Sequence, residues 1–266
     1  MRKYWHILTI GIQNTLVYRV NFFFRALFNL IPLLATISLW RAIYEGKPGA
    51  VAGYSLAQMV SYYLLVCMVE ALTAVTEDEW QIAADIKDGC ISQFLVKPMD
   101  YVHYRLCLFF SGRIIYTLAA VVPVGLFVCW QQACLLPRPD PLSLGCFLVS
   151  LGLTALLQFF LSCVTAMLAF WVVEISTFVF MLLAFERLAS GQMFPIDILP
   201  PALERGLLMT PFPYQMYFPV SVYLGKISGA ALWQGLITQA CWVGVTYLLA
   251  RLVWRRGLKT YTAVGG

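Results

Sequence analysis

Charged residues are scarce in this chain of 266 residues. Aspartate, glutamate, lysine and arginine together make up 12% of the sequence, about half the share that soluble domains carry. Hydrophobic residues make up 61%. Because so few charges cannot cover the surface of a soluble domain of this size, the composition indicates an integral membrane protein.

Motifs for catalysis and metal binding are missing. The two histidines, His6 and His103, are too few and too far apart for a zinc site of the H-E-x-x-H type. The eight cysteines contain no C-x-x-C pair, and we interpret them as small buried hydrophobic residues. Asp85 and Asp88 have a D-x-x-D spacing, but the chain offers no second acidic cluster to complete a metal–diphosphate site. We therefore expect no catalytic residue and no metal site.

A nucleotide-binding loop is missing as well. The pairs Gly46–Lys47 and Gly225–Lys226 are followed by proline and isoleucine, where such a loop needs serine or threonine. If ATP drives this protein, another polypeptide hydrolyses it. The net charge of +5 does not indicate nucleic-acid binding, because the basic residues cluster beside apolar segments, where they set orientation in a membrane.

The longest apolar run extends from Leu144 to Phe185. Its 42 residues contain one charge, Glu174. A continuous helix of this length would measure about 63 Å, roughly twice the ~30 Å hydrocarbon layer of a bilayer. The run is therefore predicted to cross the membrane twice, with a turn near residues 171–176.

Hydropathy along the whole chain predicts an all-α integral membrane protein with one transmembrane domain, residues 1–266. The six predicted transmembrane helices are 22–40, 54–76, 106–130, 144–170, 174–190 and 229–250. Before them, residues 1–21 carry Trp5, Leu8, Ile12 and Leu16 at helical spacing, which predicts an amphipathic helix on the membrane surface. The alternative is that the first span begins earlier.

The distribution of lysine and arginine predicts the orientation. One side of the predicted membrane has eleven basic residues, in the N-terminal segment, the 77–105 loop and the C-terminal tail, and the other side has six. Since basic loops stay in the cytoplasm, both termini and the 77–105 loop are predicted to be cytoplasmic.

Two segments outside the spans carry apolar residues, whereas loops that only connect helices are usually short and polar. In the cytoplasmic loop 77–105, Ile91, Phe94 and Leu95 form an apolar face that either docks a partner or packs on the protein's own spans. In 191–228, six prolines interrupt an apolar sequence, which predicts short re-entrant helices on the extracellular side. We expect few regular hydrogen bonds there, with Ser190–Gly191 as a hinge.

Four charges fall inside or beside the predicted spans: Arg25, Glu70, Arg113 and Glu174. A carboxylate in a membrane is a functional candidate by default. Both glutamates lie towards the cytoplasmic ends of their spans, and both arginines lie at comparable depth. We favour structural ion pairing over a proton relay.

With these segments placed, the chain resembles the membrane subunits of type-2 ATP-binding-cassette (ABC-2) exporters, and more narrowly their bacterial, antibiotic-resistance-like branch. The resemblance covers essentially the whole chain. It rests on ADIKDGCISQFLVKPMDY (84–101), SGQMFPIDILPPAL (190–203), TPFPYQMYFPVSVYLG (210–225) and WRRGLKTYTAVGG (254–266). Each segment is a weak motif, but their order on a six-span frame is fairly specific.

The resemblance implies a half-transporter in the bacterial cytoplasmic membrane. Residues 1–21 would be a connecting helix, and the 77–105 loop would couple to the ATPase through Asp85, Ile86, Lys87, Asp88, Gly89, Ile91, Phe94 and Leu95. The segment 191–228 would be an extracellular gate, with Ser190, Gly191, Phe194 and Pro195 at its hinge.

The resemblance also implies partners. A second six-span permease, identical or related, would complete the pathway along the first, second and fifth spans, among membrane lipids. Two ABC ATPase subunits would bind ATP and magnesium, and the chain itself would bind no cofactor. Apolar spans favour an amphipathic, lipid-like or drug-like substrate. The alternatives are an ATPase-independent channel or secondary transporter and, third, a membrane-embedded enzyme.

Overall fold

The computed structural model describes residues 2–17, 19–28, 30–45, 53–73, 78–130, 139–172 and 174–261. Within these ranges the chain is helical and contains no β-strand. The helices are α1 (Arg2–Leu16), α2 (Arg19–Phe28), α3 (Leu30–Glu45), α4 (Leu56–Thr73), α5 (Asp78–Lys87), α6 (Ile91–Leu95), α7 (Tyr101–Trp130), α8 (Pro141–Ala166), η2 (Met167–Phe170), α9 (Ser176–Ala189), η3 (Ile196–Ile198), α10 (Pro201–Leu208), η4 (Phe212–Tyr214), α11 (Tyr217–Tyr223) and α12 (Gly229–Thr260).

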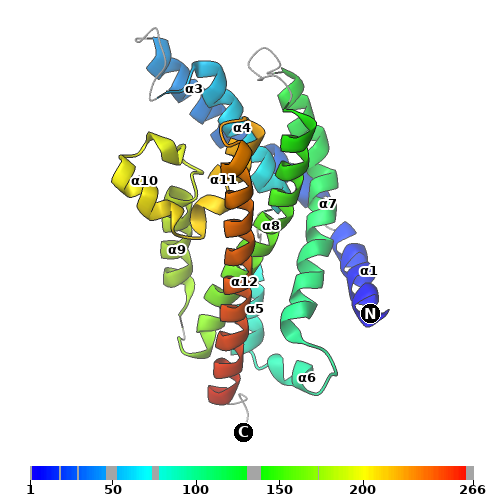
Figure 1. The fold of residues 1–266 in the computed structure, drawn as a ribbon. Coiled ribbons are helices and arrows are strands. Elements are labelled where there is room, and N and C mark those ends of the chain that lie inside the picture. The colour runs from blue at the N-terminus through cyan, green and yellow to red at the C-terminus, as the bar shows by residue number, and fades with distance from the viewer. Residues whose placement is uncertain are drawn as a thin grey trace.

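Helix α8 forms the centre of the bundle. It packs against α12, α11, α5 and α4, and Figure 1 shows α12 crossing in front of it. The sequence at its start favours this helix: the Asp140 carboxylate accepts a hydrogen bond from the Ser143 amide at 3.3 Å, and Pro141 occupies the first helical position. Fully buried side chains along α8, such as Leu157 and Phe159, place it in the core.

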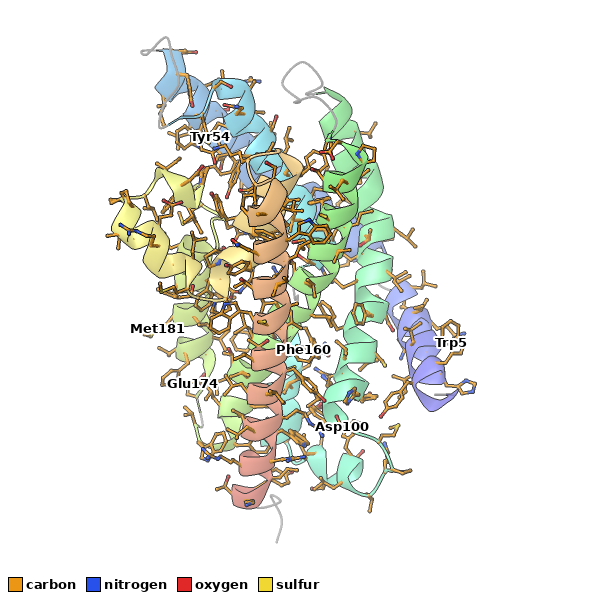
Figure 2. All side chains as sticks on the ribbon, viewed as in Figure 1. Trp5, Tyr54, Asp100, Phe160, Glu174 and Met181 are labelled. Atoms are coloured by element: carbon orange, nitrogen blue, oxygen red, sulfur yellow. The ribbon has the colours of Figure 1, made fainter. Side chains whose placement is uncertain are left out.

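Helices α1 and α2 pack on one side of α7. Gly11 permits the close approach of α1, because a Cβ atom there would lie 2.6 Å from the Ser111 hydroxyl. That hydroxyl donates a hydrogen bond to the Leu8 carbonyl at 3.0 Å. The outer face of α1 leaves Trp5 and Leu16 exposed, and Figure 2 shows Trp5 pointing away from the bundle. Exposed apolar side chains on this face fit the predicted amphipathic helix.

Three helices in the described part of the chain are long and apolar enough to cross a membrane: α4, the unit formed by α8 and η2, and α12. The predicted span 106–130 lies within α7, which has 30 residues. Helix α9 has only 14 residues, or about 21 Å, which is less than the ~30 Å hydrocarbon layer. The six-span arrangement therefore stays a prediction.

The helices differ most from the predicted spans at two places. The span predicted at 22–40 corresponds to two described helices, α2 and α3. The last helix continues to Thr260, ten residues past the predicted end at 250. Hydropathy detects where the apolar residues stop, whereas a helix continues as long as its backbone hydrogen bonds do. The chain turns between Phe170 and Ser176, where the sequence predicts a turn.

Candidate functional site

The predicted coupling residues lie on α5, α6 and the turn between them. Helix α5 packs against α8 and η2 and buries Ile82, Ala83 and Ile86. Its last turn leaves Lys87 exposed, and Asp88 is exposed in the following turn. The structure therefore buries Ile86 in the core and leaves the two charged residues on the surface.

Helix α6 divides the predicted apolar face. Ile91 is completely buried, and the Phe94 ring lies 5.2 Å from Tyr101 and 4.9 Å from Tyr104. Leu95 instead is 56% exposed, and the adjacent Val96 is 86% exposed. Ile91 and Phe94 thus pack on the protein itself, whereas Leu95 is exposed and its docking to a partner stays a prediction.

Aromatic stacking attaches the 77–105 loop to the C-terminal part of α12. The ring of Tyr101, at the start of α7, stacks on Trp254 of α12 at 4.8 Å and 5°. Its hydroxyl donates to the Asp85 carboxylate at 2.6 Å, and the Arg105 guanidinium lies 3.9 Å from the same carboxylate. Burial raises the pKa of the Tyr101 phenol, so it remains a donor at neutral pH. A movement of the loop would therefore displace side chains of both α7 and α12.

A second link joins the loop to α12 through Asp100 (Figure 2). Its carboxylate pairs with Arg251 of α12 and with the His103 ring, which lies at 2.9 Å. Partial burial raises the pKa of Asp100, but the hydrogen bonds from Arg251 and His103 outweigh it and hold this pKa below its ordinary value. The carboxylate is therefore ionised at neutral pH, and the link weakens only when the pH falls through that lowered pKa.

The predicted re-entrant segment folds into η3, α10, η4 and α11. Figure 1 shows α10 on the outside of the bundle beside α9. Gly191 has a φ of +86°, a region that glycine adopts without strain. The Tyr62 hydroxyl of α4 donates to the Gly191 carbonyl at 2.6 Å, and the Tyr63 hydroxyl donates to the Met193 carbonyl at 2.6 Å. Two neighbouring tyrosines thus hold the predicted hinge.

A buried glutamine fixes the middle of the same segment. The Gln239 amide of α12 donates to the Tyr214 carbonyl at 2.9 Å and to the Thr154 hydroxyl of α8 at 3.0 Å. The Ser150 hydroxyl donates back to the Gln239 carbonyl oxygen at 2.9 Å. Side chains of α4, α8 and α12 thus supply hydrogen-bond partners for backbone carbonyls of this segment, in agreement with the expectation that it packs on the protein's own helices.

An ion-pair cluster joins the segment 191–228 to Tyr54, which lies just before α4. The Asp197 carboxylate accepts hydrogen bonds from the Tyr54 hydroxyl at 2.8 and 2.9 Å, and the Lys226 ammonium lies 2.8 Å from it. Lys226 also lies 3.0 Å from the centre of the Tyr54 ring. Sequence reasoning missed this cluster, since the three residues have no regular spacing.

The remaining predicted site residues occupy different surroundings. Ser190 and Pro195 are buried, and Phe194 is half-buried. Among the membrane charges, Glu70 lies near the Gln192 side chain and near the charge of Arg187 of α9. The guanidinium of Arg113 lies over the rings of Tyr116, at 4.9 Å, and Phe109, at 5.9 Å.

Glu174 lies just before α9, at the surface, and its carboxylate accepts a hydrogen bond from the Ser176 amide at 3.0 Å. The side chain of Arg25 lies outside the described residues. In the part of the chain that the structure describes, no three His, Cys, Asp or Glu side chains come together to hold a metal ion.

Comparison with known proteins assigns the chain to a family. Residues 30–265, nearly the whole chain, match the family model described as "ABC-2 family transporter protein". No curated protein matches the chain significantly. The matched range includes the 77–105 loop, the proline-rich segment and α12, whose contacts are described above. The chain therefore belongs to the ABC-2 transporter family and is a multi-pass membrane permease.

Proposed function

We propose that this permease is one half of an ABC exporter. Two ATPase subunits bind ATP and magnesium on the cytoplasmic side, and a second six-span permease completes the pathway. The observation that carries this proposal is the coupling loop: an exposed apolar tip, Leu95 and Val96, sits on a base joined to α12 by the Tyr101–Trp254 stack. A docked ATPase could therefore move α12 through the loop.

The exposed face of α9 supports the pairing with a second permease. Phe180, Met181, Phe185 and Leu188 are exposed on this helix, and Figure 2 shows Met181 on its outer side. Such a face suits either a second permease or an amphipathic, lipid-like or drug-like substrate moving between the two halves. A second copy of this chain would present the same face.

The test is ATP-driven flux. The permease is co-expressed with a soluble ABC ATPase from its source organism, purified, and reconstituted in vesicles with a fluorescent lipid. We expect the ATPase to co-purify and the lipid to change leaflet only when ATP and magnesium are present. A catalytically inactive ATPase is the control. Flux of equal rate without ATP would favour a channel or a secondary transporter and would overturn the proposal.

The proposed orientation places both termini and the coupling loop in the cytoplasm, and native cysteines can test it. Cys90 lies in the turn before α6 and is partly exposed. We expect it to react with a membrane-impermeant maleimide only after the cells are opened. Cys134, which lies outside the described residues, should react in intact cells. Cys241 is exposed on the middle of α12, and lipid should shield it on both sides. Labelling of Cys90 in intact cells would invert the topology.

We also propose that residues 191–228 are the extracellular gate, which must move during export. Met193 is a better tether than the half-buried Phe194, because its side chain is 55% exposed. In a homodimer, Met193→Cys should form a disulfide between the two copies. Oxidation should stop export, ATPase binding should persist, and reduction should restore export. Leu203→Cys, exposed on α10, is the matched control. Full export with the Met193 disulfide formed would identify the segment as a static plug.

A further inference from the structure

A hollow lies along the last turns of α12, in the red part of the chain in Figure 1. Its volume is about 490 Å³, and because all the residues that line it lie on this one helix, it is an open groove on the surface of α12 and not an enclosed cavity. The residues that line it are Tyr247, Leu248, Arg251, Leu252, Arg255, Arg256 and Lys259. Four of these seven are basic, so the hollow suits an anion.

Three of the four positive charges have no acidic partner among the described residues. Arg251 is paired with Asp100. Within the described residues, no ion pair joins Arg255, Arg256 or Lys259 to a carboxylate, and all three are exposed. In the 77–105 loop, Asp85 is engaged by Tyr101 and Arg105, and Asp100 is engaged by Arg251. The hollow thus keeps an excess of about three positive charges.

The apolar part of the hollow continues into the membrane-facing side of α12. Leu248 and Leu252 are exposed, as are Val245 and Leu249 just before them. On a helix that crosses a membrane, such a strip faces acyl chains. At 1.5 Å per residue, Arg255 and Lys259 lie about 4.5 and 10.5 Å beyond Leu252 along the axis. If the hydrocarbon ends near Leu252, the headgroup layer, about 5–7 Å thick on each side, includes Arg255 and Arg256, and Lys259 lies just beyond it.

We propose that this hollow binds the phosphate of an anionic phospholipid, with the acyl chains along Leu248 and Leu252. The two guanidinium groups of Arg255 and Arg256 can each offer paired N–H donors to phosphate oxygens, and Lys259 adds a compact positive charge. An acidic protein segment would also be attracted to the basic residues. The lipid fits better, because both leucines line the same hollow as the charges. The proposal requires only that α12 spans the membrane.

The experiment measures lipid binding by the purified, full-length permease. Native mass spectrometry counts the phosphatidylglycerol and phosphatidylcholine molecules that stay bound after release from detergent. We expect wild type to retain phosphatidylglycerol preferentially. Arg255→Gln with Arg256→Gln should weaken that binding by about 30-fold, since each basic residue near an anionic surface contributes about fivefold. Arg255→Lys with Arg256→Lys should keep most of the preference.

Lys87→Gln with Lys97→Gln is the matched control. It removes the same charge from exposed positions of the coupling loop, outside the hollow, and should leave lipid retention unchanged. An equal loss in this control would show that the net charge attracts the lipid, and the site would be rejected. Displacement by inorganic phosphate at millimolar concentration would indicate a free-anion site instead. If the arginine pair proves necessary for retaining the ATPase but not phosphatidylglycerol, the occupant is a protein and the proposal fails.

Discussion

Replacing Leu95 and Val96 by aspartate should abolish ATP-driven export and leave the permease folded. Both side chains are exposed at the tip of the coupling loop, so the free protein has no reason to unfold. In a complex with the ATPase, each new carboxylate would be buried without a partner, at a cost of several kcal/mol. We expect the affinity for the ATPase to fall by more than 100-fold, which pull-down and ATPase stimulation would measure.

Two controls separate docking from folding. Leu203→Asp with Met209→Asp adds the same charges at exposed apolar positions of the segment 191–228, and should leave ATPase binding intact. Ile91→Asp, in contrast, puts a charge into the core and should reduce the yield of folded permease. ATPase stimulation at the wild-type level in the Leu95 and Val96 double variant would show that the ATPase docks elsewhere.

Replacing Gly191 by alanine should destabilise the permease by several kcal/mol. At a φ of +86° an L-residue is strained by about 1–3 kcal/mol. The new Cβ would also lie 2.8 Å from the Cβ of Tyr217 and 2.9 Å from the Tyr62 hydroxyl. Moving that hydroxyl would break its hydrogen bond to the Gly191 carbonyl, which costs about 1–3 kcal/mol more. The midpoint of thermal unfolding in detergent measures the loss.

Gly206→Ala is the matched control for that substitution. Gly206 lies inside α10, has no atom within 4 Å of an added Cβ, and does not have a positive φ. Alanine there should be neutral or stabilise the helix by about 0.5–1 kcal/mol. Equal melting temperatures for the two variants would mean that the backbone at Gly191 is not held as the structure shows.

Much of the architecture follows from the sequence by itself. The run of 42 residues with one charge dictates a membrane protein, because water cannot be kept from so much apolar surface in any other way. The prolines between residues 191 and 228 dictate short helices, because each removes an amide donor and disfavours the α conformation before it. The family resemblance rests on the same segments, and the family match confirms it.

Only the tertiary structure decided which residues of these segments are buried in the bundle and which are exposed. Ile91 and Leu95 stand one turn apart on a short helix, and periodicity alone cannot say which of them meets α7 and α12. The side chains that bind the proline-rich segment also lie far from it in sequence. Tyr62 lies 129 residues from Gly191, and Tyr54 lies 143 residues from Asp197. Such contacts depend on how helices pack across the bundle, and local sequence patterns encode backbone conformation and amphipathicity, not the identity of a neighbour.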